Sequence, residues 1–305
     1  METIFIGNYI RQRRRELNLT QEQLCAGICD PATLSRIETG HQTPTRARLN
    51  ALLQRLGLPD TRYYAIVSKN ELEIEALKKE ITACNILDRV DEGFEKLAQL
   101  EELAEPDDTL TLQFILRTNA LLGRLDGRYS QAEQLELLLR AICLTIPQFQ
   151  MEAISSFLYT FEEAKIINHI AGIYSNSDQL EKAIFIYEQL LNYIRLHYQE
   201  ILTENGLLPL VLHNYARALA LNKQYRESIR IAEDGWQSCI RYGHHQFLPG
   251  YFAIMGECYH FIGDDIQSKK FYTFAYYLYN ALGNKRNLSA VVKESKEYIS
   301  LEFEF

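Results

Sequence analysis

The feature that most constrains the fold is a pair of small residues, twelve positions apart, that recurs four times between residues 120 and 268. A polar turn lies between the two members of each pair. Small residues at this spacing allow two antiparallel helices to approach closely, so each pair predicts one helical hairpin. Stacked hairpins of this kind form an all-α repeat domain. The pairs are Ala120 and Ala132, Ala171 and Ala183, Ala216 and Ser228, and Gly256 and Ser268.

The residues on either side of these pairs extend the helical pattern. The stretch from 69 to 104 is rich in Glu, Lys, Leu and Ile and has no proline, which predicts helices and a further, degenerate repeat within 70–105. The stretch from Asn287 onward is predicted to form a capping helix. We therefore expect a first domain at 1–66, a connector helix at 67–85 and a repeat domain at 86–305.

Residues 1–66 contain the start and stop signals of short helices. Thr20 followed by Gln23 matches a capping box. Gly27 stands at the turn that follows, and Asp30 before Pro31 marks the start of the next helix. Two short helices joined by a tight glycine turn, inside about 60 residues, predict a helix-turn-helix domain.

Two further helices and an excess of arginine complete this first domain. One helix is expected at 5–17, and another from Pro44 to Leu56 with Thr43 as its cap. Residues 1–66 hold nine Arg and no Lys against six acidic residues, whereas the whole chain has a net charge of −8. A basic first domain on an acidic body indicates that the first domain binds nucleic acid.

The run LTQEQLCAGICDPATLSRIETG closely resembles the lambda-repressor-like, Xre-type family. The hairpins resemble tetratricopeptide repeats, although their spacing exceeds the usual 34 or so residues and Gly123 stands where a large residue is expected. Together they resemble the Rgg, PlcR and NprR type (RRNPP) of peptide-sensing regulators. This resemblance implies a cytoplasmic homodimer for quorum sensing, a transcriptional regulator that binds an inverted repeat in double-stranded DNA and a short signalling peptide in the repeat groove. The matching landmarks in the first domain are Leu19, Thr20, Gln21, Leu24, Ser35, Arg36, Ile37, Glu38 and Gly40.

The second helix of such a motif enters the major groove, with its N-terminal residues at the base edges. Arg36 is the best direct reader, because a guanidinium can donate two hydrogen bonds to guanine. By resemblance, Gln21 contacts a phosphate. The expected DNA-binding residues are Gln21, Ala32, Thr33, Ser35, Arg36 and Arg46.

In tetratricopeptide domains the groove-facing positions lie three before and one after the first small residue of each hairpin. An asparagine there can pair with both the N–H and the C=O of a peptide, and Arg217 can hold a carboxylate. We expect Asn168, Asn214 and Arg217 to face solvent when the groove is empty. The expected peptide-binding residues are Arg117, Lys165, Asn168, His213, Asn214, Arg217 and Glu257.

Other classes of function lack their signatures. The six cysteines include no Cys-x-x-Cys pair, so we expect no metal site, and nothing indicates a cofactor. No Gly-rich phosphate loop, GxSxG or HExxH indicates an enzyme. No apolar run reaches the length of about 20 residues that spans a membrane. Two alternatives stay open: the repeat domain binds or dephosphorylates a partner protein such as a response regulator, with DNA binding secondary, or it binds a protein in place of a peptide.

Overall fold

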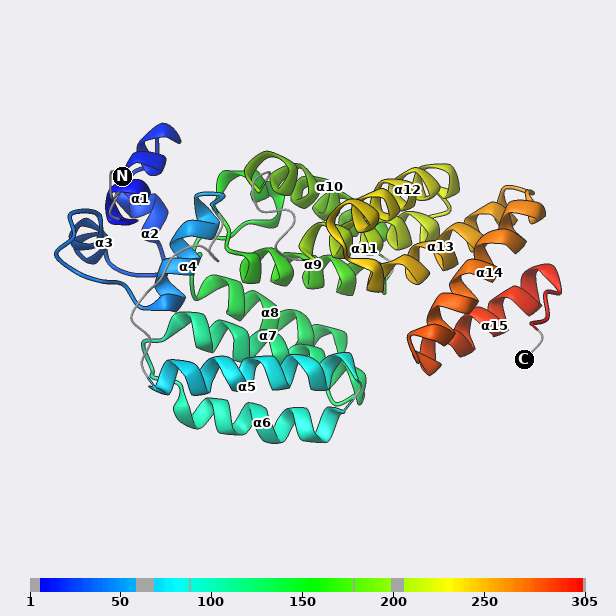
Figure 1. The fold of residues 1–305 in the computed structure, drawn as a ribbon, viewed down its shortest axis with the longest axis horizontal. Coiled ribbons are helices and arrows are strands. Elements are labelled where there is room, and N and C mark those ends of the chain that lie inside the picture. The colour runs from blue at the N-terminus through cyan, green and yellow to red at the C-terminus, as the bar shows by residue number, and fades with distance from the viewer. Residues whose placement is uncertain (1–5, 59–68, 88, 178, 199–205, 304–305) are drawn as a thin grey trace. The chain divides into compact units, whose positions relative to one another are not determined.

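The computed structural model describes residues 6–58, 69–87, 89–177, 179–198 and 206–303, and these residues form helices and no strand (Figure 1). The predicted all-α fold is confirmed.

The chain divides into two compact units: unit 1 comprises Met1–Ile173 and Leu196–Ile201, and unit 2 comprises Tyr174–Arg195 and Leu202–Phe305. The helices are α1 (Ile6–Glu16), α2 (Gln21–Cys25), α3 (Pro31–Glu38), α4 (Arg46–Arg55), α5 (Lys69–Ile86), α6 (Val90–Leu103), α7 (Thr109–Leu125), α8 (Gln131–Cys143), α9 (Phe161–Ser175), α10 (Leu180–His197), α11 (Leu207–Leu221), α12 (Tyr225–Tyr242), α13 (Leu248–Phe261), α14 (Asp265–Ala281) and α15 (Lys285–Ile299), with 3-10 turns at Met151–Ser156 and His245–Phe247.

Helices α1 to α4 form the helix-turn-helix head, and its local signals act as predicted. The capping box of α2 is present, with the Thr20 hydroxyl accepting from the Gln23 N–H and the Gln23 side chain accepting from the Thr20 N–H. Asp30 caps α3 by accepting from the Thr33 N–H at 2.8 Å. Gly27 adopts a φ of +68°, which a residue with a side chain rarely adopts, so the tight turn requires glycine.

The start of α4 corrects one prediction. Thr43 was expected to cap this helix, but Thr45 is the cap and accepts from the Arg48 N–H. Thr43-Pro44 and Thr45-Arg46 both fit the pattern of a cap followed by a first helical residue. The buried ring of Pro44 instead occupies the position before the cap, from which an apolar residue typically packs on the first helical turns.

Within unit 1, α5 pairs with α6 and α7 pairs with α8, and the four helices lie in a stack (Figure 1). Ile81, Leu97, Leu100 and Leu122 belong to the core that α5, α6 and α7 share. Most of the predicted connector thus lies in α5, which packs against α6. The predicted boundary between 66 and 67 falls in residues 59–68, outside the described part.

The α7–α8 hairpin differs from the expected pairing of small residues. Ala120 is buried, but Ala132 is exposed, so Ala132 is not a point of close approach. The connection at residues 126–130 is longer than the one at 222–224 and shifts the register of α8, where Gln134 is buried instead. Gly123 instead leaves room for a side chain of the connection, because an added Cβ would lie 2.0 Å from Cδ2 of Tyr129.

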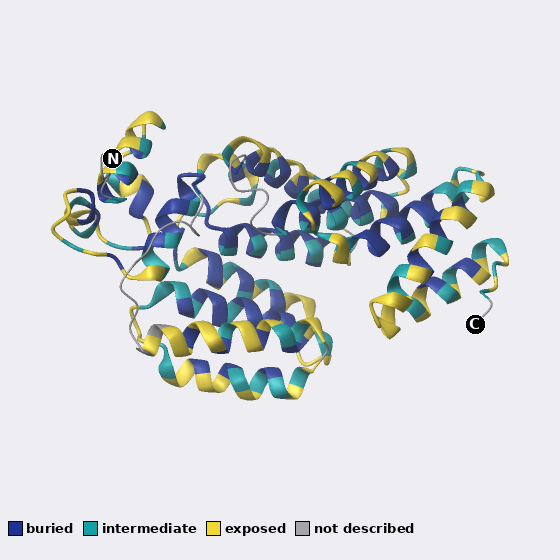
Figure 2. Ribbon diagram, in the orientation of Figure 1, coloured by how far each residue is buried: buried dark blue, intermediate teal, exposed yellow. Residues whose placement is uncertain are grey.

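Within unit 2, the small-residue pairs mark the helix contacts as predicted. The Ser228 hydroxyl of α12 donates to the Ala216 carbonyl of α11 at 2.7 Å, and the Ser268 hydroxyl of α14 donates to the Gly256 carbonyl of α13 at 2.7 Å. Helix α15 packs on α14 and α13. Buried residues concentrate on α11 and α13, whereas α15 is largely exposed (Figure 2).

Candidate functional sites

Helix α3 presents an open outer face on the head. Ala32 and Arg36 are exposed, and Thr33 and Ser35 are half-buried. The Thr33 hydroxyl donates to Asp30 at 2.6 Å, and this bond, together with the Thr33 N–H, lowers the pKa of Asp30. The side chain of Arg36 has no hydrogen-bond or ionic partner among the described residues. Its guanidinium therefore keeps all its donors for a ligand.

A buried ion pair fixes α3 against the rest of the head. Arg14 donates to both carboxylate oxygens of Glu38, at 2.6 and 2.9 Å, and to the Leu19 carbonyl at 2.8 Å. Gln21 donates to Glu38 at 2.8 Å, so Gln21 and α3 are held in one network. The amide nitrogen of Gln21 has a second hydrogen, which stays available for a phosphate.

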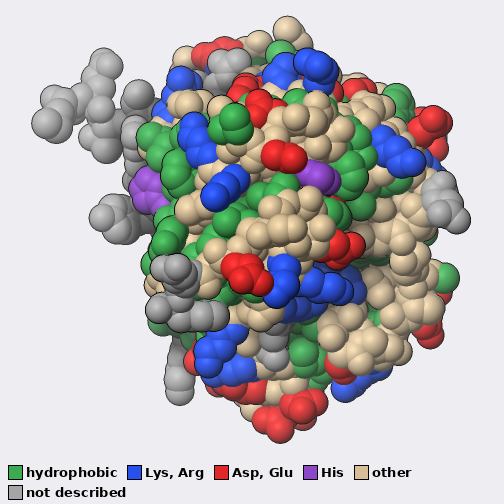
Figure 3. Space-filling model, turned by 90° about the vertical axis from the view of Figure 1, so that its right-hand side faces the viewer, with side chains coloured by type: hydrophobic (Ala, Val, Ile, Leu, Met, Phe, Trp, Pro, Cys, Tyr) green, Lys and Arg blue, Asp and Glu red, His purple; other side chains and the backbone are tan. Residues whose placement is uncertain are grey.

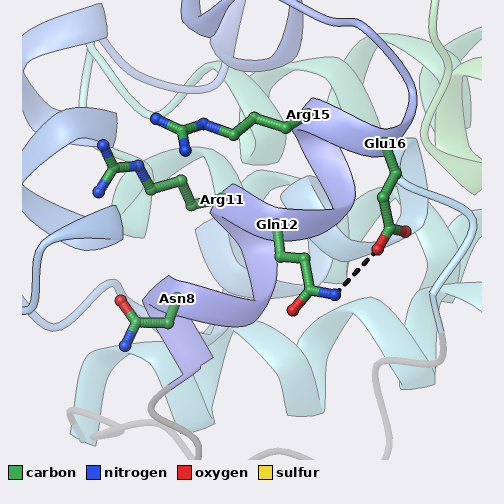
Figure 4. A pocket seen from close by; sticks show the side chains of 5 residues that line it. All are labelled: Asn8, Arg11, Gln12, Arg15 and Glu16. Carbon is green, nitrogen blue, oxygen red and sulfur yellow. Dashed lines mark hydrogen bonds between the residues drawn. The ribbon is translucent and has the colours of Figure 1, made fainter.

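Further basic residues lie on α1 and α4 of the head. Arg46 is exposed at the first position of α4. On α1, Arg11 and Arg15 extend in the same direction, one helical turn apart, beside a shallow hollow of about 460 Å³ (Figure 4). The neighbouring Gln12 donates to Glu16 at 2.9 Å. Sequence reasoning did not include Arg11 and Arg15 among the site residues, although their spacing on one face was readable.

In unit 1 the structure brings Arg117 and Lys165 together through Glu162, which was not predicted. The Nε of Arg117 donates to one oxygen of Glu162, and Nζ of Lys165 lies 3.8 Å from the other. Burial alone would raise the pKa of Glu162, but Arg117 and Lys165 hold this pKa below its usual value. Asn168 is 0% exposed, so the expectation that it faces solvent is wrong. Its side chain lies within the almost continuously buried stretch of α9 from Ile166 to Ala171.

His169 lies among the cations of this cluster. Burial lowers its pKa, and Arg117, Arg124 and Lys165 lower it further, so the imidazole is neutral at neutral pH. Burial also lowers the pKa of Lys165, against the opposing effect of Glu162. The cluster thus contains more basic than acidic side chains.

In unit 2 the predicted residues meet in two pairs. Arg217 donates to Glu257, and Nδ1 of His213 lies 3.3 Å from Oδ1 of Asn214. Burial lowers the pKa of His213. Beside Glu257, burial and the Glu257 charge raise the pKa of Glu294. Arg217 therefore already has a carboxylate partner, and a second acid lies nearby.

A second unpredicted contact in unit 1 holds the head against α9. Arg55 at the end of α4 binds Glu163 at 2.8 Å, with both side chains 1% exposed or less. Arg55 also donates to the carbonyls of Leu24 and Ala26, at 3.0 and 2.6 Å. The ion pair joins residues 108 positions apart, so no local sequence pattern predicts it.

No three His, Cys, Asp or Glu side chains among the described residues are placed to hold a metal ion. No helix in this part of the chain has the length and apolar character that crossing a membrane requires.

Comparisons with known proteins place this architecture in a family. No curated protein sequence matches the chain. The model of a helix-turn-helix domain matches residues 6–63, and the model of the RNPP family C-terminal domain matches residues 107–300.

Solved structures share the fold at low identity. PlcR of Bacillus thuringiensis, in complex with the peptide PapR7 and DNA, is 20% identical with a TM-score of 0.65, and the match covers 95% of this chain and 99% of that one. ComR from S. thermophilus, in complex with DNA and its signalling peptide ComS, is 17% identical with a TM-score of 0.52, covering 97% and 100%. The fold is a helix-turn-helix domain followed by tetratricopeptide-like repeats, and the chain belongs to the RNPP family.

Proposed function

We propose that this protein is a cytoplasmic transcriptional regulator, and no enzyme, whose sequence-specific DNA binding is controlled by an oligopeptide bound to its repeat domain, as in quorum sensing. The observation that carries this proposal is an unpartnered Arg36 on the open face of α3, in a head followed by an RNPP domain. PlcR and ComR, which share the fold over almost the whole chain, were solved with DNA and a peptide.

The head reads DNA through α3. Arg36 donates to a guanine in the major groove, and Ala32 and Thr33 contact bases next to it. Because the Thr33 hydroxyl is engaged by Asp30, its methyl group is the part that meets a thymine. Gln21 and Arg46 contact phosphates, which position the head without reading sequence.

The repeat domain binds the peptide through the polar residues of its first helices. In unit 1 these are Arg117 and Lys165, since Asn168 is fully buried, and in unit 2 they are His213, Asn214, Arg217 and Glu257. The peptide changes DNA binding only by the difference in its affinity for the two conformations of the protein.

The protein acts as a homodimer, because an inverted repeat in DNA mirrors a two-fold axis in the protein. Unit 2 offers apolar surface for such a contact. The face of the molecule that carries α14 and α15 shows apolar side chains interspersed with charged ones (Figure 3). The exposed large apolar residues of α13 and α14 are Phe261, Ile266, Phe274 and Tyr277. Sedimentation that finds only monomer at tens of micromolar, with and without DNA, would contradict this.

Selection from a pool of randomised duplexes tests DNA recognition. Full-length protein should enrich one sequence, and Arg36→Ala should weaken binding to that sequence by about 1–3 kcal/mol, with a smaller loss on random DNA. Gln21→Ala should weaken both about equally. Arg241→Ala, which removes an exposed arginine from α12, is the matched control. Absence of any enriched sequence would show that the proposal is wrong.

A further inference from the structure

The side chains around His169 come from the same faces of α7 and α9. Arg117 and Arg124 lie two helical turns apart on α7, and Glu162, Lys165 and His169 follow one another at helical spacing on α9. Arg117, Arg124 and Lys165 all act on the ionisation of His169. Glu162 is an acidic side chain in contact with two of these cations, Arg117 and Lys165.

Glu162 alone does not fill the hydrogen-bond donors of Arg117 and Lys165. One of its oxygens is bound by Arg117, and the other lies 3.8 Å from the Lys165 nitrogen, beyond a direct hydrogen bond. The Lys165 side chain is 36% exposed, so its ammonium keeps donors that a ligand can reach. Nδ1 of His169 is buried and has no hydrogen-bond partner among the described residues. Positive charge held in a partly buried place is costly, and an anion relieves that cost.

We propose that this α7–α9 cluster is the subsite for a carboxylate of the peptide ligand, with Lys165 as its hydrogen-bond donor and Arg117, already bound to Glu162, adding positive charge. This inference rests on the proposed function, because it names the chemical group that the repeat domain recognises. The carboxylate comes from the C-terminus of the peptide or from an acidic side chain. In either case an ammonium or guanidinium donating to a carboxylate forms the stronger, charge-assisted type of hydrogen bond.

The polar residues of unit 2 do not suit a carboxylate. Arg217 is bound to Glu257. Glu294 is a second acid at this place, and the charge of Glu257 opposes its ionisation. A carboxylate arriving there would meet two acids and one cation that is already paired. The α7–α9 cluster has the opposite balance.

A pool of random heptapeptides, synthesised in three forms, tests the subsite on the full-length protein. The first form has a free C-terminus, the second a C-terminal amide, and the third a free C-terminus but no Asp or Glu. Retained peptides are quantified by mass spectrometry. If the terminal carboxylate is bound, amidation reduces retention about tenfold or more; if a side chain is bound, removal of Asp and Glu does so instead.

Variants assign the effect to the cluster. Lys165→Gln should reduce retention of the preferred pool about tenfold and remove the difference between pools, whereas Lys165→Arg should keep that difference. Lys269→Gln, at an exposed position on α14, is the matched control and should change neither. Circular dichroism confirms that each variant is folded.

The outcomes separate the two proposals. Equal retention of all three pools, or an unchanged preference in Lys165→Gln, overturns the carboxylate subsite and leaves peptide control standing. Retention of no peptide from any pool overturns both.

Discussion

Unit 1 and unit 2 each contain an ion pair that joins the first helices of consecutive hairpins. In unit 1, Arg117 of α7 binds Glu162 of α9, and in unit 2, Arg217 of α11 binds Glu257 of α13. The two arginines occupy different positions relative to the small residue of their helices, three before Ala120 and one after Ala216. The same chemical contact therefore arises from two different positions in the repeat.

The charged residues that surround the two ion pairs have opposite signs. Lys165 adds a cation beside Glu162, whereas Glu294 adds an acid beside Glu257. The paired residues hold helices together. The neighbouring side chain, Lys165 in unit 1 and Glu294 in unit 2, sets the charge that a ligand meets. Residues chosen only for facing a groove, such as Arg217, can therefore be committed to the protein's own structure.

The largest expected effect is a difference in stability between a fully buried ion pair and a partly exposed one. Glu163→Gln keeps the shape of the side chain but leaves Arg55 buried without its counter-charge, which should lower the free energy of unfolding by about 3–5 kcal/mol. Glu257→Gln should cost about 1 kcal/mol or less, because the Arg217 side chain is 39% exposed and can hydrate. Urea denaturation measures both. Similar losses would mean that burial does not distinguish the two pairs.

A smaller effect compares two glycines, one in each unit, against which a tyrosine ring packs. In unit 2 a Cβ added at Gly235 would lie 2.2 Å from the ring of Tyr251, which is 0% exposed, so Gly235→Ala should cost about 1–3 kcal/mol. In unit 1 Gly123→Ala meets Tyr129, which is only half-buried and can move. There the helix propensity of alanine, worth about 1 kcal/mol, should offset much of the cost. Thermal unfolding of both variants tests this order.

The smallest expected effect is an opposite pH dependence of two glutamates. Burial would raise the pKa of Glu162 above 4.5, but Arg117 and Lys165 hold it below, so its contribution is present above pH 4.5 and is lost as the pH falls further. Burial and Glu257 raise the pKa of Glu294 above 4.5, so its ionisation removes stability as the pH rises through and above 4.5.

Melting temperatures of Glu162→Gln and Glu294→Gln, measured from about pH 4 to pH 7, test these signs. Glu162→Gln should be less stable than the unmodified protein at neutral pH, and Glu294→Gln should be more stable. Both differences should shrink towards the acidic end. Differences of the same sign at neutral pH would contradict the contrast between the clusters.

The features that the sequence predicted correctly are mostly those that depend on residues close together in the chain. The capping box at Thr20 and the cap at Asp30 were predictable because each involves residues three positions apart. The choice between Thr43 and Thr45 failed because both threonines fit the same local pattern. The fold class followed from the periodicity of small residues, although the exposed Ala132 shows that one longer loop shifts the register.

The candidate site was less predictable, because its chemistry depends on distant partners. Glu162 and Glu163 are ordinary acidic residues at the start of a helix until Arg117 and Arg55 are placed beside them. The burial of Asn168 depends on what surrounds α9 and not on its position relative to Ala171. The open face of α3 was predictable, since its geometry is local to the head.

The contact between Arg55 and Glu163 has a consequence for changing which DNA the protein recognises. The end of α4 is one of the places where the head meets its own body: Arg55 binds Glu163, and Gln54 accepts from the Phe161 N–H at 3.0 Å. A head transplanted from another protein would bring a different α4 and leave Glu163 without its cation. Retargeting, in the laboratory or in evolution, should therefore proceed by exchanging the outer residues of α3 one at a time, and a grafted head should need at least positions 54 and 55 transplanted back.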